Sequence, residues 1–177
     1  MDTQIYQIFK KVRLLIVDVD GVLTDGRIVY SSNGEELKFF NVQDGLGIHI
    51  LKRMGIPTVI VTAKASATVR LRARDMEVES IFEDTLPKVE AYEKIKKQYG
   101  FVDEQICFIA DDLIDLGVMK KVGVPVAVNN ACEEIKREAV YITHNNGGFG
   151  AVREVVELIL KSQNKWKQVL GLFSSSL

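Results

Sequence analysis

"LLIVDVDGVLTDG", residues 14–26, runs from four consecutive apolar residues into two aspartates that stand two positions apart. A continuous apolar run of this length predicts a strand of a parallel sheet that is buried on both faces. Alternate residues of an extended chain point to the same side, so Asp18 and Asp20 share one side of this strand. The stretch therefore predicts a buried strand that delivers two carboxylates to one cleft.

Outward from this stretch, apolar runs alternate with amphipathic patterns of helix length. Further strands are predicted at 56–62, 78–82, 105–110 and 124–128. Helical patterns are found at 44–55, 66–76, 86–100, 112–123, 132–139 and 150–163. This alternation predicts an α/β fold, a doubly wound (Rossmann-like) parallel sheet with helices on both faces.

One segment interrupts the alternation. "GRIVYSSNGEELKFF", about residues 26–40, has two β-rich arms around Asn33 and Gly34, which predicts a β-hairpin inserted after the first strand. The C-terminal tail, about residues 163–177, carries five large apolar residues: Trp166, Val169, Leu170, Leu172 and Phe173. We expect this tail either to fray or to dock on the globule or on a neighbouring subunit.

The composition excludes several classes of protein. The chain has 177 residues, of which 47% are hydrophobic, and a net charge of -1, which predicts one packed domain over residues 1–177. Lys and Arg are scattered, so no nucleic-acid-binding stripe is expected. No apolar run approaches a membrane span, the first residues lack a secretion signal, and Cys107 and Cys132 have no partners at metal-ligand spacing. We therefore expect a cytoplasmic protein that binds neither membrane nor nucleic acid.

Polar side chains follow four of the predicted strands. They are Asp18, Asp20, Thr62, Lys88, Asp111 and Asp115. Because ligands bind at the carboxyl ends of parallel strands, we expect these side chains to meet in one cleft. Clustered carboxylates suit Mg²⁺, and a carboxylate can also attack phosphorus as a nucleophile. A lysine and a threonine would stabilise phosphoryl oxygens there.

Taken in order, these motifs resemble the haloacid dehalogenase superfamily, and most closely its capless class. "DVDGVLTDG", "NGEELKFFNVQDGLGI", "FIADDLIDLGVMKKVGVPVAV" and "GGFGAVREV" all have counterparts there, and the resemblance covers about residues 11–163. It implies a Mg²⁺-dependent phosphatase that forms an aspartyl-phosphate. The implied substrate is 3-deoxy-D-manno-octulosonate 8-phosphate, which would place the chain in lipopolysaccharide precursor synthesis.

The resemblance also implies a role for each motif residue. Asp18 attacks phosphorus, and Asp20 protonates the leaving sugar oxygen and then activates water. Thr62 and Lys88 hold the phosphoryl group. The implied metal ligands are Asp18, Asp20 through its backbone carbonyl, Asp111 and Asp115. Asp112 either shares that work or caps the following helix.

A homotetramer with active sites at its subunit interfaces is implied as well, assembled through the hairpin. The residues implied to contact the sugar are Asn41, Val42, Gln43, Asp44 and Gly45, together with Asp20 and Lys88. Lys64 and Arg72 fall where family members place basic groups near the substrate. A solvated arginine on a helix face explains Arg72 equally well.

The sequence departs from the family pattern at three places. Ala63 and Lys64 replace the usual Gly-Arg pair, Ala110 replaces a glycine before Asp111, and Phe149 stands in the loop "GGFG". If position 110 needs a positive φ, alanine adds strain of about 1 kcal/mol there. These departures put the identity of the substrate in question more than the type of reaction.

Three other functions remain open at this point. The first is a phosphatase of another 2-keto sugar acid phosphate, of the nine-carbon type. The second is a catalytically degenerate scaffold of the same fold. The third is a receiver-like phosphoacceptor module, which would need an acceptor aspartate on a middle strand, where only Asp84 stands.

Overall fold

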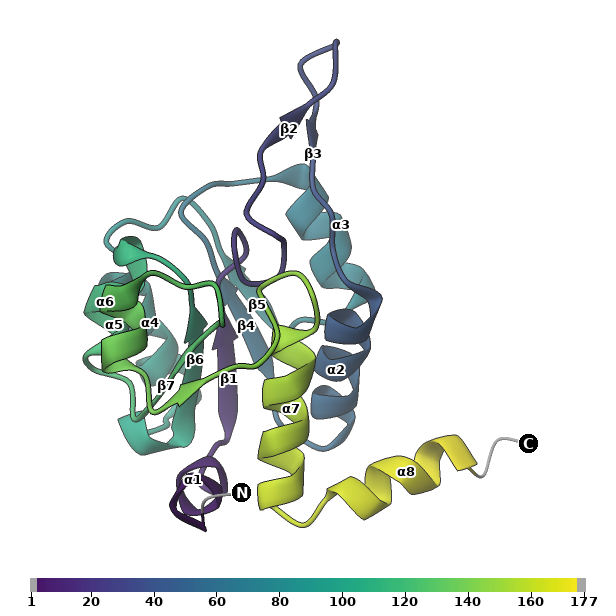
Figure 1. The fold of residues 1–177 in the computed structure, drawn as a ribbon, viewed down its shortest axis with the longest axis vertical. Coiled ribbons are helices and arrows are strands. Elements are labelled where there is room, and N and C mark those ends of the chain that lie inside the picture. Colours follow the sequence, from purple (N-terminus) through teal and green to yellow (C-terminus); the bar gives the residue numbers. More distant parts are fainter. Residues whose placement is uncertain (1–2, 175–177) are drawn as a thin grey trace.

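Six parallel strands form the central sheet of the structure, a computed structural model that describes residues 3–174 (Figure 1). The strands are β1 (Leu14–Val17), β4 (Thr58–Val61), β5 (Ser80–Phe82), β6 (Ile106–Ala110), β7 (Val124–Ala127) and β8 (Tyr141–Ile142). Their order across the sheet is β5-β4-β1-β6-β7-β8. The chain first builds outward from β1 on one side and then on the other, which confirms the doubly wound sheet.

The first predicted strand lies at the centre of this sheet. Every residue of β1 is buried, and the strand pairs with β4 through Leu15 and Thr58 and with β6 through Leu14 and Ile106. All five predicted strands are present. The additional strand, β8, has only two residues, which is too short for a detectable pattern.

Helices cover both faces of the sheet (Figure 1). On one face lie α2 (Val42–Arg53), α3 (Ala67–Asp75) and α7 (Ala151–Ser162), and on the other α4 (Lys88–Tyr99), α5 (Leu116–Met119) and α6 (Glu133–Glu138). Two short 3-10 turns, η1 (Asp103–Gln105) and η2 (Leu113–Asp115), flank β6. The sequence patterns predicted these six α-helices, whereas α1 (Thr3–Phe9) was not predicted.

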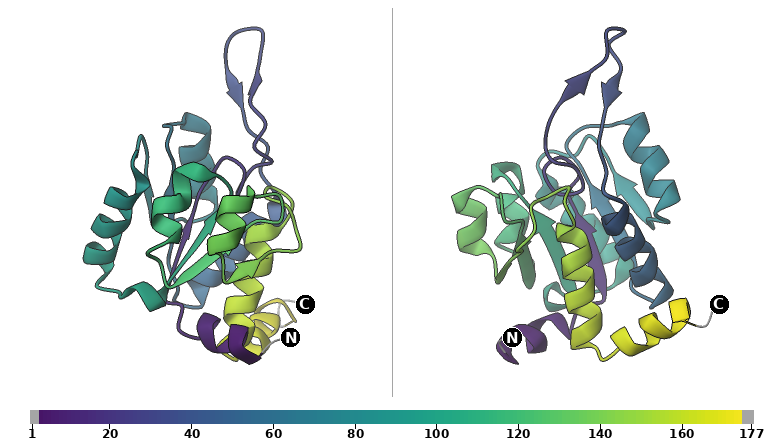
Figure 2. Two further views of the ribbon diagram at one scale, coloured as in Figure 1. Left: turned by 60° about the vertical axis from the view of Figure 1, so that its left-hand side comes forward. Right: turned by 45° about the vertical axis from the view of Figure 1, so that its right-hand side comes forward.

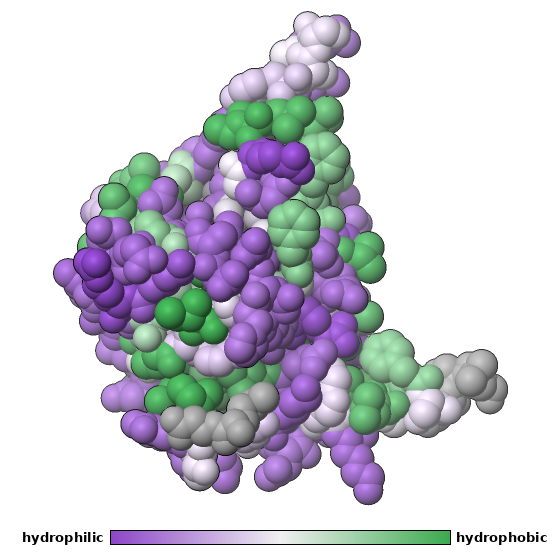
Figure 3. Space-filling model, in the orientation of Figure 1, coloured by the Kyte–Doolittle hydropathy of each residue, from purple (hydrophilic) through white to green (hydrophobic). Residues whose placement is uncertain are grey.

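The predicted hairpin is present and projects beyond the carboxyl ends of the strands (Figure 2). Its strands are β2 (Val29–Tyr30) and β3 (Glu36–Leu37), and Gly34 in the turn has a φ of 80°, which glycine adopts without strain. A bridge between Thr24 and Phe40 closes its base. The hairpin exposes four large apolar residues: Ile28, Tyr30, Leu37 and Phe39. Figure 3 shows apolar side chains gathered on this projection.

Most of the C-terminal tail forms an additional helix, α8 (Trp166–Ser174), which leads away from α7 (Figure 1). Val169 is buried against the core, whereas Leu170 and Phe173 are exposed. The tail therefore docks on the globule along one side only, and residues 175–177 lie outside the described residues. No helix within residues 3–174 has the length and apolar character needed to cross a bilayer.

Candidate active site

A cleft of about 230 Å³ opens at the carboxyl ends of the central strands. The hairpin projects from the same end of the sheet (Figure 1). Asp18 directly follows β1, Thr62 follows β4 and Asp111 follows β6. The cleft is lined by Asp18, Asp20, Gly26, Thr62, Ala63, Lys64, Asp111, Asp112 and Ile114. The structure therefore brings the predicted strand-end residues together, as expected for the switch point of a doubly wound sheet.

Lys88 lies beneath this cleft, where it joins two carboxylates. It is the first residue of α4, only 1% exposed, and its Nζ lies 2.8 Å from Asp18 Oδ1 and 2.7 Å from Asp115 Oδ1. Burial alone would lower the pKa of Lys88, but the two neighbouring carboxylates outweigh burial and raise it. Lys88 is therefore a charged, fixed group at the base of the site.

The acidic cluster fits a divalent cation. Asp18, Asp111 and Asp115 each place a carboxylate oxygen within 4.8 Å of the others, and Asp115 Oδ2 is buried without a hydrogen-bond partner. Burial first, and a neighbouring carboxylate second, raise the pKa of Asp18 to about 7, and the pKa of Asp111 likewise to about 7. A cation would favour the ionised carboxylates, and an all-oxygen donor set is what Mg²⁺ prefers.

Gly21 allows this cluster to form. It has a φ of 89°, and any side chain at this position would collide with the Asp111 carboxylate. The glycine that follows Asp20 is therefore required by the close approach of the two loops, as well as by its backbone conformation.

We expect Mg²⁺ to raise the melting temperature by about 5 °C at pH 8, and by less than about half as much at pH 5.5. The pKa values of Asp18 and Asp111 lie above those of the unfolded chain, so ionising them costs stability as the pH rises from about 4 to about 7. Mg²⁺ offsets that cost in full at pH 8, where the carboxylates are ionised, and only in part at pH 5.5, where it must compete with bound protons. Thermal melts with Mg²⁺ or EDTA measure the effect, which Asp111→Asn should abolish. Equal shifts at both pH values would contradict it.

Asp20, the proposed acid and base, is tied to the hairpin. Its Oδ1 lies 2.5 Å from Nζ of Lys38, the residue that follows β3. Glu36 Oε1 in turn lies 3.6 Å from Lys38 Nζ and 3.0 Å from Lys64 Nζ. A hydrogen bond from Lys64 lowers the pKa of Glu36. Lys38 and Glu36 were not predicted from the sequence as site residues, although their two-residue spacing along a predicted strand places both on one side.

The motif that follows β6 contains two acids besides Asp111, and these have different roles. Asp112 is exposed, and its carboxylate accepts a hydrogen bond of 2.8 Å from the amide of Leu113, which makes it the N-cap of η2. Asp115 is completely buried and contacts Lys88. Of the two roles considered for Asp112, the structure therefore supports the helix cap.

Residues 41–45, predicted to contact the sugar, lie outside the acidic cleft of their own chain. Asn41 caps α2 by accepting a hydrogen bond from the amide of Gln43, and Val42 and Gln43 are exposed. The Arg72 guanidinium packs on Gly45 and donates to the Asn41 carbonyl over 3.3 Å. Arg72 is therefore bound to this segment and is not a freely solvated helix residue.

Asp44 is the exception within this segment. It is 1% exposed, and its carboxylate accepts hydrogen bonds from the amides of Gly150 (3.2 Å) and Arg153 (2.8 Å) at the start of α7. Burial raises the pKa of Asp44. In this structure its carboxylate caps α7 and does not point to a ligand site.

The departures from the family pattern leave the backbone unstrained. Ala110 lies in β6 without a positive φ, so the strain considered for it does not arise. Ala63 lines the cleft, and Phe149 is exposed. These residues change the surface that a substrate meets and leave every polar group of the cluster in place.

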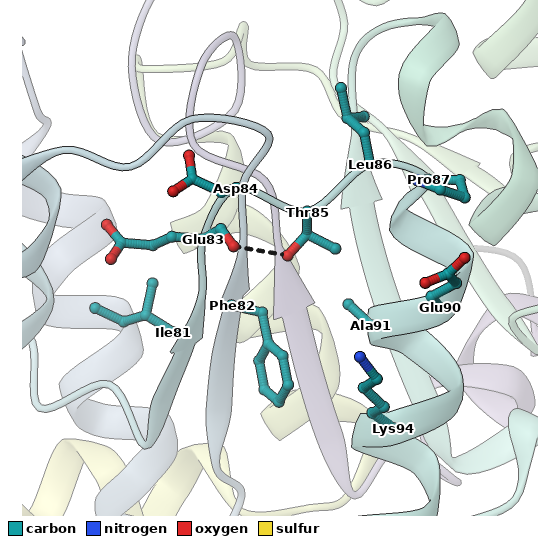
Figure 4. Close-up of a pocket in the computed structure, with 10 residues that line it drawn as sticks. All are labelled: Ile81, Phe82, Glu83, Asp84, Thr85, Leu86, Pro87, Glu90, Ala91 and Lys94. Carbon is teal, nitrogen blue, oxygen red and sulfur yellow. Dashed lines mark hydrogen bonds between the residues drawn. The ribbon is translucent and has the colours of Figure 1, made fainter.

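A second hollow, of about 440 Å³, lies between the end of β5 and the start of α4 (Figure 4). Asp84 stands at its edge, where its carboxylate accepts a hydrogen bond from the amide of Ala65. Glu83 similarly accepts from the amide of Ser66. Asp84 therefore joins two loops. A receiver module would require it to be a member of the acidic cluster, which it is not.

Comparisons with known proteins agree with this geometry. A sequence model of the haloacid dehalogenase-like hydrolases matches residues 71–156. The 3-deoxy-D-manno-octulosonate 8-phosphate phosphatase KdsC of Salmonella typhi is 40% identical over 162 residues, 92% of this chain and 86% of the relative. The enzyme of the same name from Yersinia pestis is 42% identical over 161 residues, 91% of this chain and 86% of the relative.

A solved structure is equally similar. The 3-deoxy-D-manno-octulosonate 8-phosphate phosphatase of Moraxella catarrhalis, in complex with magnesium, phosphate and the sugar acid, superimposes with a TM-score of 0.94. It is 41% identical, and the match covers 98% of this chain and 99% of that one. The similarity therefore extends over nearly the whole chain, in both sequence and fold. The chain therefore belongs to the haloacid dehalogenase-like hydrolases, in the family that includes the 3-deoxy-D-manno-octulosonate 8-phosphate phosphatases.

Proposed function

We propose that this chain is a magnesium-dependent phosphatase that converts 3-deoxy-D-manno-octulosonate 8-phosphate to the free sugar acid and inorganic phosphate, in lipopolysaccharide precursor synthesis. The observation that carries the proposal is the buried bridge of Lys88 between Asp18 and Asp115, with Asp111 within reach of a shared cation. Relatives 40–42% identical over nine-tenths of the chain carry the name of this activity.

The positions of these side chains support the following reaction. An Asp18 oxygen attacks phosphorus while the bond to the sugar oxygen breaks, and Asp20 gives that oxygen its proton. Asp20 then takes a proton from water, which attacks phosphorus and releases phosphate from Asp18. Lys88 and the Thr62 hydroxyl stabilise the charge on the phosphoryl oxygens. The acidic cluster and the Asp20 carbonyl would hold Mg²⁺, which would supply further positive charge at those oxygens.

The acidic substrate is consistent with basic groups near the cleft. Lys64 lines the cleft, and its side chain is 56% exposed beside Glu36 of the hairpin. Lys64 lacks the bidentate fork of the arginine usual at this position, which leaves a nine-carbon 2-keto acid phosphate as the second candidate substrate. A neutral sugar phosphate would offer Lys64 no carboxylate beyond its ion pair with Glu36.

We further propose a cytoplasmic homotetramer in which neighbouring subunits complete each active site. Two observations support assembly: the hairpin exposes large apolar side chains, and Arg72 and the segment 41–45 to which it binds form a cluster outside the cleft of their own chain. In the assembly, that cluster would face the sugar bound to a neighbour. Sedimentation of the intact chain reports the number of subunits.

The function is tested by phosphate release from three substrates: the eight-carbon sugar acid phosphate, its nine-carbon counterpart and a neutral sugar phosphate. We expect kcat/KM for the eight-carbon substrate to exceed the others by at least about tenfold, which corresponds to 1.4 kcal/mol of discrimination. EDTA should stop the reaction, and Mg²⁺ should restore it. A preference for the neutral sugar would overturn the proposed substrate, and activity in EDTA would overturn the proposed metal dependence.

A further inference from the structure

The second arm of the hairpin presents two different faces. Leu37 and Phe39 are exposed outward, at 45% and 57% of their surface. Glu36 and Lys38 alternate with them and turn inward, and their side chains are only 16% and 4% exposed. Lysine is almost never buried without a partner, so the sheltered position of Lys38 on a projecting hairpin calls for a specific contact.

That contact is the carboxylate of Asp20. The distance from Lys38 Nζ to Asp20 Oδ1 is 2.5 Å, a charge-assisted hydrogen bond. Within residues 3–174, Lys38 is the one hydrogen-bond donor to the Asp20 side chain, which is itself 42% exposed. Without Lys38, this carboxylate would turn freely about its side-chain bonds at the open edge of the cleft.

We propose that Lys38 is a positioning residue that fixes the carboxyl group of Asp20 for proton transfer to the leaving oxygen and from water. The inference rests on the proposed phosphatase function. Proton transfer requires a donor within hydrogen-bond reach of the reacting oxygen, so a disoriented carboxyl group is a poor acid even when its chemistry is unchanged.

Glu36 extends this arrangement along the hairpin. Its Oε1 lies between the ammonium groups of Lys38 and Lys64, at 3.6 Å and 3.0 Å. The inner face of the hairpin thus joins Asp20 to the basic residue at the cleft. The hairpin therefore contributes to the active site of its own subunit, separately from any role of its apolar outer face.

The leaving group of the substrate provides the test. Release of 4-nitrophenol needs little protonation, whereas release of phenol needs more, and neither phenyl phosphate nor 4-nitrophenyl phosphate offers sugar contacts. For Lys38→Met we expect kcat/KM to fall about thirtyfold with phenyl phosphate and about threefold with 4-nitrophenyl phosphate. These losses are only part of the effect of removing a general acid, because Asp20 itself is still present. Lys38→Gln keeps a neutral hydrogen-bond donor and provides a second variant should Lys38→Met not fold. Its kcat/KM with phenyl phosphate should lie between those of Lys38→Met and the wild type.

A double-mutant cycle separates positioning from a structural role. In an Asp20→Asn protein, Lys38→Met should change the ratio of the two kcat/KM values less than about twofold, because the group it positions is gone. Lys121→Met removes an exposed ion pair with Glu93, remote from the cleft, and should leave the ratio unchanged. Equal losses on both aryl phosphates, or the same effect in the Asp20→Asn background, would overturn the role of Lys38. A wild-type protein that hydrolyses neither the sugar acid phosphates nor the aryl phosphates would overturn the proposed function itself, and the inference with it.

Discussion

Asp18→Asn lowers kcat for phosphate release by at least about 10³-fold, because the amide oxygen is a poor nucleophile and no aspartyl-phosphate forms. The substitution is nearly isosteric, and the amide oxygen still accepts a hydrogen bond from the Lys88 ammonium group, which lies 2.8 Å from Asp18 Oδ1. The fold should therefore persist. Steady-state phosphate release, measured beside a thermal melt, checks both expectations.

Asp112→Asn is the matched control for Asp18→Asn. Asp112 also lines the cleft, but its carboxylate caps η2, and asparagine caps a helix about as well. This control should keep kcat within about twofold of the wild type, since surface substitutions of this kind change little. Equal rates for Asp18→Asn and the wild type would refute the nucleophile, and a large loss in Asp112→Asn would give that residue a part in the reaction.

The sequence predicts the strands and the acidic cluster well for a physical reason. A strand buried on both faces must be continuously apolar, as all of β1 and β6 are. The polar residue that follows such a run stands at the carboxyl end of the strand. Asp18 and Asp111 end these two runs. Because β1 and β6 are neighbours in the sheet, the two carboxylates meet in the cleft.

Contacts between distant segments leave no pattern in the sequence comparable to these apolar runs. Asp44 stands within a motif that resembles a sugar-binding segment, yet its carboxylate caps α7, which begins more than a hundred residues later. Lys38 is 18 positions from Asp20, and only the bend of the hairpin brings them together. A local pattern reports burial and periodicity, and neither identifies which polar group satisfies a given amide or carboxylate.

Lys88→Met is expected to impair both stability and catalysis. It removes the partner of two buried carboxylates, Asp18 and Asp115, and breaking a buried ion pair in this way costs about 3 kcal/mol in the free energy of unfolding. The cost should be present at pH 8 in EDTA and smaller at pH 6. Loss of the ammonium charge raises the carboxyl pKa values further, so at pH 6 the acids protonate and the repulsion between them disappears.

Mg²⁺ separates the two effects of Lys88→Met. A cation in the acidic cluster replaces part of the lost positive charge, so Mg²⁺ should recover part of the stability at pH 8. It should not recover kcat, which we expect to stay at least about 10²-fold below the wild type, because Lys88 also stabilises the phosphoryl oxygens. Urea unfolding with Mg²⁺ or EDTA, together with steady-state phosphate release, measures both quantities.

The control for Lys88→Met lies on the same helix. Lys96 forms an ion pair of 2.8 Å with Asp103 at the surface, and Lys96→Met should stay within about 1 kcal/mol of the wild type, as exposed pairs do. It should also leave kcat and the response to Mg²⁺ unchanged. If Lys88→Met were as stable as Lys96→Met at pH 8 in EDTA, the buried bridge would not be what holds the two carboxylates in place. If Mg²⁺ restored kcat in full, Lys88 would serve the acidic cluster alone and not the phosphoryl group.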